Sequence, residues 1–269
     1  MAGIILQDVD LEFRVDALKH DTFRSALVRF LGRRTSRRIK TLQSISLRIE
    51  RGERVGLIGH NGAGKTTLLK VMAGIYPPQR GLVATEGHIC PLFEVVTGFE
   101  WDASGWENIR TRALLLGMSP GEIDRRIEGI GRFSNLGEFL DIPVRHYSQG
   151  MHLRLAFATS AAVEPEILLL DEVMAAGDVA FIDTARRRMN ELMTRASIVV
   201  FATHSLDMLP HFCERTILLR HGRIVADGPT REVVQRYEEA EAEAPGAFAE
   251  DARAGRAGGA PSAPASSAK

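Results

Sequence analysis

The stretch Gly59-His60-Asn61-Gly62-Ala63-Gly64-Lys65-Thr66-Thr67 decides the fold of this chain, because it matches the pattern G-x-x-x-x-G-K-[ST]. The short apolar run at 54–58 predicts a buried strand before it, and residues 67–73 predict a helix after it that ends at Gly74. A strand, a glycine-rich loop and a helix in this order are the context in which the pattern binds phosphate. The alternative is a fortuitous glycine-rich turn.

The chemistry expected of this loop is anion binding. Glycines allow successive backbone N–H groups to point inward, and the N-terminus of the next helix adds partial positive charge. Lys65 is expected to reach the β- and γ-phosphates of a nucleotide, and the Thr66 hydroxyl is expected to ligate Mg²⁺. The other candidates for phosphate binding are the remaining loop residues Gly59, Asn61, Gly62, Ala63, Gly64 and Thr67.

Composition indicates an ordinary soluble protein of one large or two small domains, with 269 residues, 45% of them hydrophobic and 25% charged. The formal net charge is zero, so no overall field favours nucleic acid as a partner. Cys90 and Cys213 lie far apart, which predicts reduced thiols in a cytosolic protein. No apolar run approaches the roughly 20 residues that span a bilayer, and the N-terminus lacks a signal-peptide core. A membrane role is therefore expected to come through a partner or a surface contact.

The first part of the chain alternates between predicted strands and a basic segment. Strands are predicted at 4–13, 45–49 and 89–93, and residues 77–87 are rich in turn formers. Within the basic segment 14–40, apolar residues between 23 and 31 have helical spacing. This helix would lie on an anionic membrane or a membrane partner, or would pack on its own domain with a solvated basic face.

The second part predicts helices and buried strands. Residues 111–140 and 154–163 are helical in pattern, and the apolar runs 167–170 and 198–202 are typical of central parallel strands. Residues 216–225 predict a terminal hairpin. Beyond Glu238 the chain is rich in Ala, Glu, Gly, Pro and Ser without a period, which predicts a disordered tail.

Three groups of residues are expected to complete a nucleotide site. Asp171 and Glu172 end a buried strand, where the first suits Mg²⁺ and the second suits polarisation of an attacking water; capping of the next helix is the alternative. The motif 147–151 precedes a helix and offers a second N-terminus with a hydroxyl and a glycine for phosphate. His204 follows strand 198–202, where its imidazole would hydrogen-bond a γ-phosphate or have a purely structural role. Its position after the carboxylates in the sequence favours the role at the γ-phosphate.

With these motifs in this order, the chain resembles an ATP-binding-cassette (ABC) ATPase from residue 4 to residue 237. Residues 59–67 correspond to Walker A, 168–172 to Walker B and 147–151 to the LSGGQ-type motif, while 175–178 and His204 correspond to the D-loop and the switch histidine. The resemblance implies an α/β fold with a RecA-like P-loop NTPase core, an N-terminal antiparallel β subdomain and an inserted helical subdomain. The expected bounds are 1–239 for the cassette, about 99–158 for the helical part and 240–269 for the tail.

The resemblance also implies a site shared between two subunits. One subunit would supply the phosphate loop, Asp171, Glu172 and His204 to ATP and Mg²⁺. The other would supply Ser148, Gln149 and Gly150 against the γ-phosphate, so that ATP joins the subunits and hydrolysis releases them. Phe13 stands where the family carries an aromatic residue that stacks on adenine, although a core phenylalanine at a strand end is the alternative.

Further stretches of the sequence are similar to those of one ABC subfamily. Residues 140–151, 171–181 and 98–109 resemble the corresponding stretches of bacterial polysaccharide exporters, and the basic insertion 14–40 is typical of exporters of capsule, O-antigen or teichoic-acid chains. This implies an ATPase subunit that forms a homodimer, docks on integral-membrane permease subunits at the cytoplasmic face of the bacterial inner membrane, and binds no nucleic acid. The alternatives are a soluble ABC ATPase with a regulatory, ribosomal or DNA-related role, and an exporter of a non-glycan substrate.

The chain departs from the family pattern at three places. Glu94 stands where a coupling-loop glutamine is usual; its carboxylate would still reach Mg²⁺ or a water, so it is a candidate metal ligand. Gln149 replaces the first glycine of LSGGQ. Some O-antigen exporters carry a C-terminal β-sandwich that recognises the glycan end, whereas this chain ends in the predicted tail and is expected not to recognise that end by itself.

Overall fold

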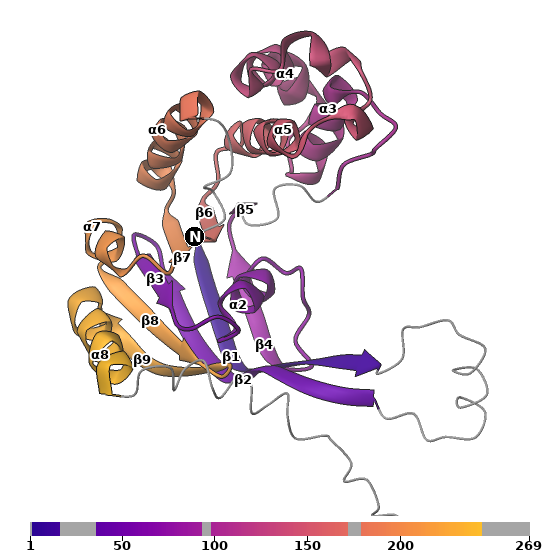
Figure 1. The fold of residues 1–269 in the computed structure, drawn as a ribbon. Coiled ribbons are helices and arrows are strands. Elements are labelled where there is room, and N and C mark those ends of the chain that lie inside the picture. Colours follow the sequence, from indigo (N-terminus) through magenta and orange to yellow (C-terminus); the bar gives the residue numbers. More distant parts are fainter. Residues whose placement is uncertain (1, 17–35, 93–97, 172–178, 244–269) are drawn as a thin grey trace, which may run out of the picture.

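The computed structural model describes residues 2–16, 36–92, 98–171 and 179–243, which form two sheets and a set of helices (Figure 1). The larger sheet has the strand order β5-β6-β7-β3-β8-β9. Neighbouring strands from β5 to β8 are parallel, and β9 is antiparallel to β8. Its strands are β5 (Ile89–Leu92), β6 (Ile167–Asp171), β7 (Ile198–Ala202), β3 (Arg54–Ile58), β8 (Arg215–Arg220) and β9 (Arg223–Pro229).

The central strands form where apolar runs are long enough to be buried on both faces. In β6, residues 167–170 are buried, and β3 and β7 follow the same pattern. Asp171 pairs with Ala202, and β3 lies on the other side of β7 in parallel register. The carboxyl ends of β3, β6 and β7 therefore meet at one edge of the sheet, where open α/β sheets bind their ligands.

The second sheet is antiparallel, with the order β2-β1-β4. β1 (Gly3–Asp16) pairs along its length with β2 (Ser36–Glu50), and its first part, from Gly3 to Asp10, pairs with β4 (Arg80–Glu86). The interpretation of 77–87 as turns was wrong, because β4 is an edge strand whose side chains are mostly exposed and so lacks an apolar run. β1 and β2 also extend into the segment 14–40 at both ends, while its predicted helix at 23–31 lies outside the described residues.

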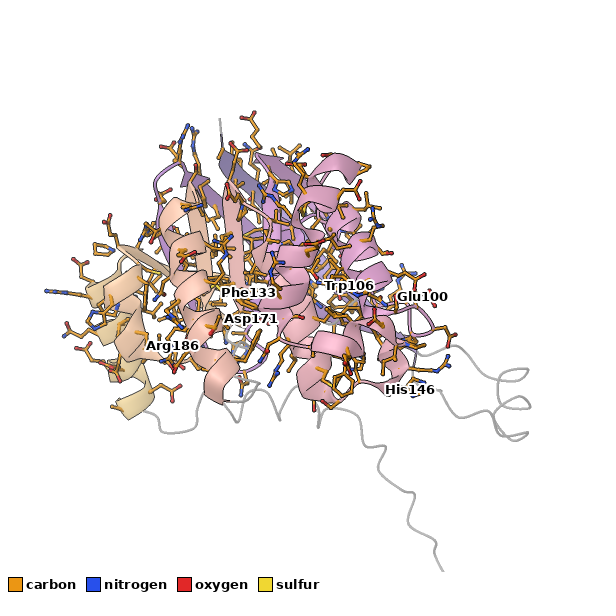
Figure 2. The ribbon with its side chains drawn as sticks, turned by 90° about the horizontal axis from the view of Figure 1, so that it is seen from above. Glu100, Trp106, Phe133, His146, Asp171 and Arg186 are labelled. Atoms are coloured by element: carbon orange, nitrogen blue, oxygen red, sulfur yellow. The ribbon has the colours of Figure 1, made fainter. Side chains whose placement is uncertain are left out.

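Three helices lie together at the far end of the molecule from the antiparallel sheet (Figure 1). They are α3 (Gly105–Leu115), α4 (Pro120–Ser134) and α5 (Gln149–Ala161), with two 3₁₀ turns, Gly137–Asp141 and Val144–His146, between α4 and α5. α3 and α4 both begin with a capping box, from Ser104 to Glu107 and from Ser119 to Glu122. Trp106 of α3 and Phe133 of α4 lie in this group in the view from above (Figure 2).

The remaining helices pack around the larger sheet. They are α2 (Lys65–Met72), α6 (Val179–Arg195), the short α7 (Leu209–Phe212) and α8 (Thr230–Glu243). The predicted hairpin is confirmed as β8 and β9. α8 continues from Glu238 to Glu243, and its residues Val233 and Tyr237 pack on the core. The rest of the predicted tail, residues 244–269, lies outside the described residues. Among the described helices, none is both long and apolar enough to cross a membrane.

Candidate functional site

The phosphate loop leaves β3 at Ile58 and enters α2 at Lys65, as its sequence predicts. Gly59, Gly62 and Gly64 have positive φ angles of 143°, 84° and 110°, which other residues adopt only with strain. A Cβ on Gly59 would lie 2.2 Å from the carbonyl oxygen of Leu219. Glycine is therefore required there both by the backbone conformation and by the close approach of β8.

Lys65 is the first residue of α2 and is only 7% exposed. Its ammonium group donates to the carbonyl oxygens of Gly59 and His60, at 2.6 and 3.2 Å. The charge thus lies inside the loop. Gly64 caps α2 without a side chain, so no capping group competes for the first N–H groups of the helix. Lysine and helix N-terminus together make this loop attractive to phosphate.

Thr66 and Asp171 meet although they are far apart in the sequence. The Thr66 hydroxyl donates to a carboxylate oxygen of Asp171 at 2.5 Å. These are two hard oxygen ligands of the kind that Mg²⁺ uses together with substrate phosphates, so the pair fits this ion. The other two predicted carboxylates, Glu172 and Glu94, lie outside the described residues.

His204 follows β7 and faces the same space. It lines a pocket of about 190 Å³ together with the phosphate loop and Asp171. The full lining is Thr41, Asn61, Gly62, Gly64, Lys65, Thr66, Thr67, Asp171 and His204. Gly59 and Ala63 do not line it but shape the loop behind it. Asp171 lies near the middle of the molecule in the view from above (Figure 2).

Thr41 is the pocket residue that sequence reasoning missed. It lies in β2, and the edge of the antiparallel sheet brings it to the loop: a Cβ on Gly64 would be 3.0 Å from the Thr41 carbonyl oxygen. No motif marks it, because its position depends on how the two sheets pack.

His60, the second residue of the loop, has a lowered pKa. Burial is the main cause, and the nearby His221, Lys65 and Arg220 disfavour a further positive charge, although a hydrogen bond from its ring to the backbone of Asn61 acts in the opposite direction. The neutral form of the His60 ring is therefore favoured over the charged form.

Phe13 lies on the antiparallel sheet and does not line the pocket. It is 36% exposed, so the alternative of a core phenylalanine was wrong. Its ring contacts Tyr76 edge-on at a centroid distance of 5.3 Å. Phe13 pairs with Ile39, two residues before Thr41 in β2. Its contact with adenine stays a prediction.

The motif around Ser148 lies at the N-terminus of α5. The Ser148 side chain caps this helix by accepting from the N–H of Met151 at 3.3 Å. Ser148 and Gln149 are exposed, Gly150 is half-buried, and none of the three lines the pocket. The structure therefore does not bring this motif to the phosphate loop of its own chain.

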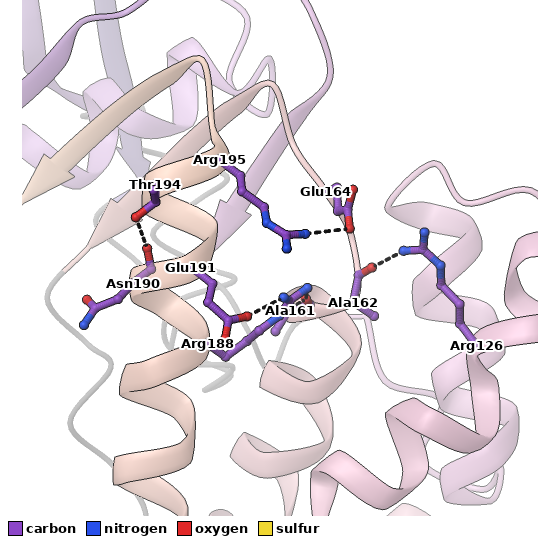
Figure 3. A network of polar contacts seen from close by, with 9 residues as sticks. All are labelled: Arg126, Ala161, Ala162, Glu164, Arg188, Asn190, Glu191, Thr194 and Arg195. Carbon is purple, nitrogen blue, oxygen red and sulfur yellow. Dashed lines mark hydrogen bonds and ion pairs between the residues drawn. The ribbon is translucent and has the colours of Figure 1, made fainter.

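The opposite end of α5 is held by arginines from its neighbours (Figure 3). Arg188 of α6 donates through Nε and Nη2 to the carbonyl oxygen of Ala161, at 3.0 and 2.8 Å. Arg126 of α4 donates to the carbonyl oxygen of Ala162 at 2.8 Å. Carbonyl groups at a helix C-terminus lack partners within the helix, so these guanidinium groups satisfy them and complement the helix dipole.

Comparison with known proteins agrees with this geometry. Residues 42–175 match the ABC transporter family. The chain is 40% identical to the O-antigen export system ATP-binding protein RfbE of Yersinia enterocolitica, over 83% of this chain and 97% of the relative. The chain belongs to the ABC transporter ATP-binding family.

Two further ABC relatives are longer than the part that this chain matches. The chain is 41% identical to the O-antigen export system ATP-binding protein RfbB of Myxococcus xanthus, over 89% of this chain and 56% of the relative. It is 38% identical to the teichoic acids export ATP-binding protein TagH of Listeria innocua, over 74% of this chain and 59% of the relative.

The fold is likewise that of an ABC ATPase. A solved ATP-binding subunit of an ABC transporter superposes with a TM-score of 0.64 at 23% identity, covering 87% of this chain and 93% of that one. The predicted α/β fold is confirmed, with its antiparallel sheet and its largely parallel core sheet.

Proposed function

We propose that this chain is the ATP-hydrolysing subunit of an exporter that moves a lipid-linked polysaccharide across the cytoplasmic membrane. The observation that carries the ATPase part is the convergence of Lys65, the Thr66–Asp171 pair and His204 on one pocket at the strand ends. The named relatives supply the substrate class, because they export O-antigen or teichoic acids.

The phosphate loop binds the nucleotide in this proposal. Backbone N–H groups of residues 61–66 and the Lys65 ammonium neutralise the β- and γ-phosphates. Thr66 and Asp171 would hold Mg²⁺, which would supply positive charge beside the phosphates. Glu172 follows Asp171 directly and accepts a proton from the attacking water, while His204 donates a hydrogen bond to the γ-phosphate.

Two copies complete each site. Ser148 and Gln149 are exposed at the N-terminus of α5 and absent from the pocket of their own chain, so they are available to the γ-phosphate held by a second subunit. ATP then joins the two copies, and hydrolysis separates them. Permease subunits in the membrane convert this closing motion into transport, and the ATPase lies on the cytoplasmic side as a peripheral subunit.

The test uses Glu172→Gln, which keeps the shape of the side chain and the Thr66–Asp171 pair but removes the base. Nucleotide binding should survive while hydrolysis falls by a factor of roughly 10²–10⁴. The variant should therefore accumulate as a dimer with Mg-ATP, but not with ADP, in size exclusion. Lys65→Ala is the control that should fail to bind. Near-normal turnover of Glu172→Gln, with a monomer under every condition, contradicts the mechanism.

The transport part has a separate test. The wild-type chain, tagged and purified from detergent-solubilised membranes, should bring down a permease with several membrane spans. Recovery of ribosomes or DNA in its place would assign the ATPase to the soluble class of ABC proteins.

A further inference from the structure

The turn between β8 and β9 forms the wall behind the phosphate loop. The N–H of Gly222 in this turn donates to the carbonyl oxygen of Ala63 at 2.9 Å. The Gly59 backbone is pressed against the Leu219 carbonyl, where a Cβ would lie only 2.2 Å from the oxygen. The end of β8 and the turn that follows it therefore contact the loop at two of its residues, Gly59 and Ala63.

The same turn rests on β2 of the antiparallel sheet. A Cβ on Gly222 would lie 2.3 Å from the carbonyl oxygen of Thr41, a residue that lines the pocket. Gly222 also has a φ of 73°, so glycine alone fits both the conformation and the space. The loop, the turn and β2 thus contact one another without intervening side chains.

The side chain of Gln43 joins the turn to β2. Its Nε2 donates to the carbonyl oxygen of His221 at 2.9 Å, and its Oε1 accepts from Nη2 of Arg223 at 3.0 Å. Its backbone N–H donates to the carbonyl oxygen of Gly222 at 2.8 Å. The side-chain amide and the backbone N–H of this half-buried residue therefore bind the turn and the first residue of β9.

A ring contact reinforces the connection on the other side of the turn. The imidazoles of His60 and His221 lie with their centroids 5.0 Å apart, one from the phosphate loop and one from the turn. A displacement of the turn would therefore move His60 together with Ala63.

We infer that Gln43 is a positioning residue for the phosphate loop, acting through the β8–β9 turn on the binding of nucleotide phosphates. This rests on the proposed function in so far as the loop binds ATP. Gln43 does not line the pocket. It holds the turn, the turn holds Ala63, and the loop is thereby preorganised for phosphate. Nucleotide then binds more tightly, because less of its binding free energy is needed to order the loop.

The main variant is Gln43→Leu, which keeps the approximate volume and removes both side-chain hydrogen bonds. The Kd for ATP and for ADP should rise together, by roughly three- to tenfold, as expected when about one hydrogen bond of preorganisation is lost. The KM for ATP should rise by a similar factor, while kcat at saturating ATP should stay within about twofold, because bound nucleotide restores the loop.

The control is Arg48→Leu. Arg48 lies on the same strand as Gln43, and its side chain is 69% exposed and pairs only with Glu50 among the described residues. Its removal tests the effect of a polar-to-apolar change on β2 without touching the turn. Gln43→Glu is a second variant, which keeps the acceptor for Arg223 but places a carboxylate oxygen against the His221 carbonyl in place of the donor, so a rise in Kd is again expected.

Measurements on the full chain are nucleotide titration, steady-state kinetics and melting without nucleotide. Hydrogen exchange of the peptide 59–66 is a further readout, and its protection should fall in both Gln43 variants. A lower melting temperature with Kd, KM and exchange equal to those of Arg48→Leu would show that Gln43 serves stability alone, and would overturn the inference. If the wild-type chain itself binds no ATP, the proposed function fails, which is a different result.

Discussion

Replacing Arg188 by methionine should remove the hydrogen bonds that join the C-terminus of α5 to α6. Arg188 makes two hydrogen bonds to the Ala161 carbonyl and a third contact, at 2.8 Å, with Glu191 on its own helix (Figure 3). Methionine keeps much of the apolar stem and removes the guanidinium group. The change therefore tests the hydrogen bonds between α5, which Ser148 caps at its other end, and α6.

The magnitude follows from the contacts. Hydrogen bonds from a charged donor contribute about 1.5–3 kcal/mol, and a cation at a helix C-terminus adds roughly 0.3–1 kcal/mol. The pair with Glu191 adds about 0.5 kcal/mol or less, because the Glu191 side chain is 56% exposed and water screens it. The Arg188 side chain is 22% exposed, so water also weakens its contacts somewhat. We therefore expect the free energy of unfolding to fall by about 2 kcal/mol, which lowers the melting temperature by roughly 4–8 °C.

Arg195→Met on the same helix is the matched control. Arg195 pairs with Glu164 at 3.3 Å, and the two side chains are 62% and 56% exposed, so its loss should lower the melting temperature by about 2 °C at most. Differential scanning fluorimetry without nucleotide measures the melting temperatures of both variants. Because Arg188 does not line the pocket, ATP affinity of the monomer should stay unchanged. Equal shifts for the two variants, or a loss of ATP affinity in Arg188→Met, would refute the reasoning.

Two other predictions concern the shared site and the thiols. Ser148→Arg should leave ATP affinity of the monomer near normal but abolish hydrolysis and ATP-driven dimerisation, because a bulky cation would meet the partner's phosphate loop; a large loss of monomer affinity would contradict the two-subunit arrangement. Burial raises the pKa of Cys90 and of Cys213 to about 12, so both thiols should resist an aromatic disulfide reagent at pH 8 and react on unfolding in urea. Since the pKa values of the folded-state thiols are raised, these thiols destabilise the fold as pH rises above roughly 8.5, the pKa of an unfolded cysteine. Rapid labelling of the native chain would contradict their burial.

Sequence was sufficient to predict the centre of the fold because the signals there are local. The run 54–58, the glycine loop and the helix after it need only neighbouring residues to be recognised, and the apolar runs that became β6 and β7 are buried on both faces. The meeting of Thr66 with Asp171 also follows from sequence, because parallel strands end at one edge of their sheet.

What sequence could not predict depends on contacts between distant residues. β4 is an edge strand with exposed side chains, so no periodic apolar pattern announces it. Gln43 and the β8–β9 turn are 178 positions apart, and Thr41 reaches the pocket only because β2 packs against that turn. In the sequence, these polar residues cannot be told apart from ordinary surface residues, because their contacts depend on how the two sheets pack.

Two separate networks therefore support the two halves of the proposed two-subunit site. The hydrogen bonds of Gln43 act on the phosphate loop, which binds nucleotide within one chain. Those of Arg188 act on α5, whose exposed N-terminus carries Ser148. Since the networks have no residue in common, damage to the first should appear in nucleotide affinity, and damage to the second in the step that joins two subunits. This division suits the proposed mechanism, in which ATP is bound by one copy and enclosed by another, because each half keeps its own geometry while the two move relative to each other.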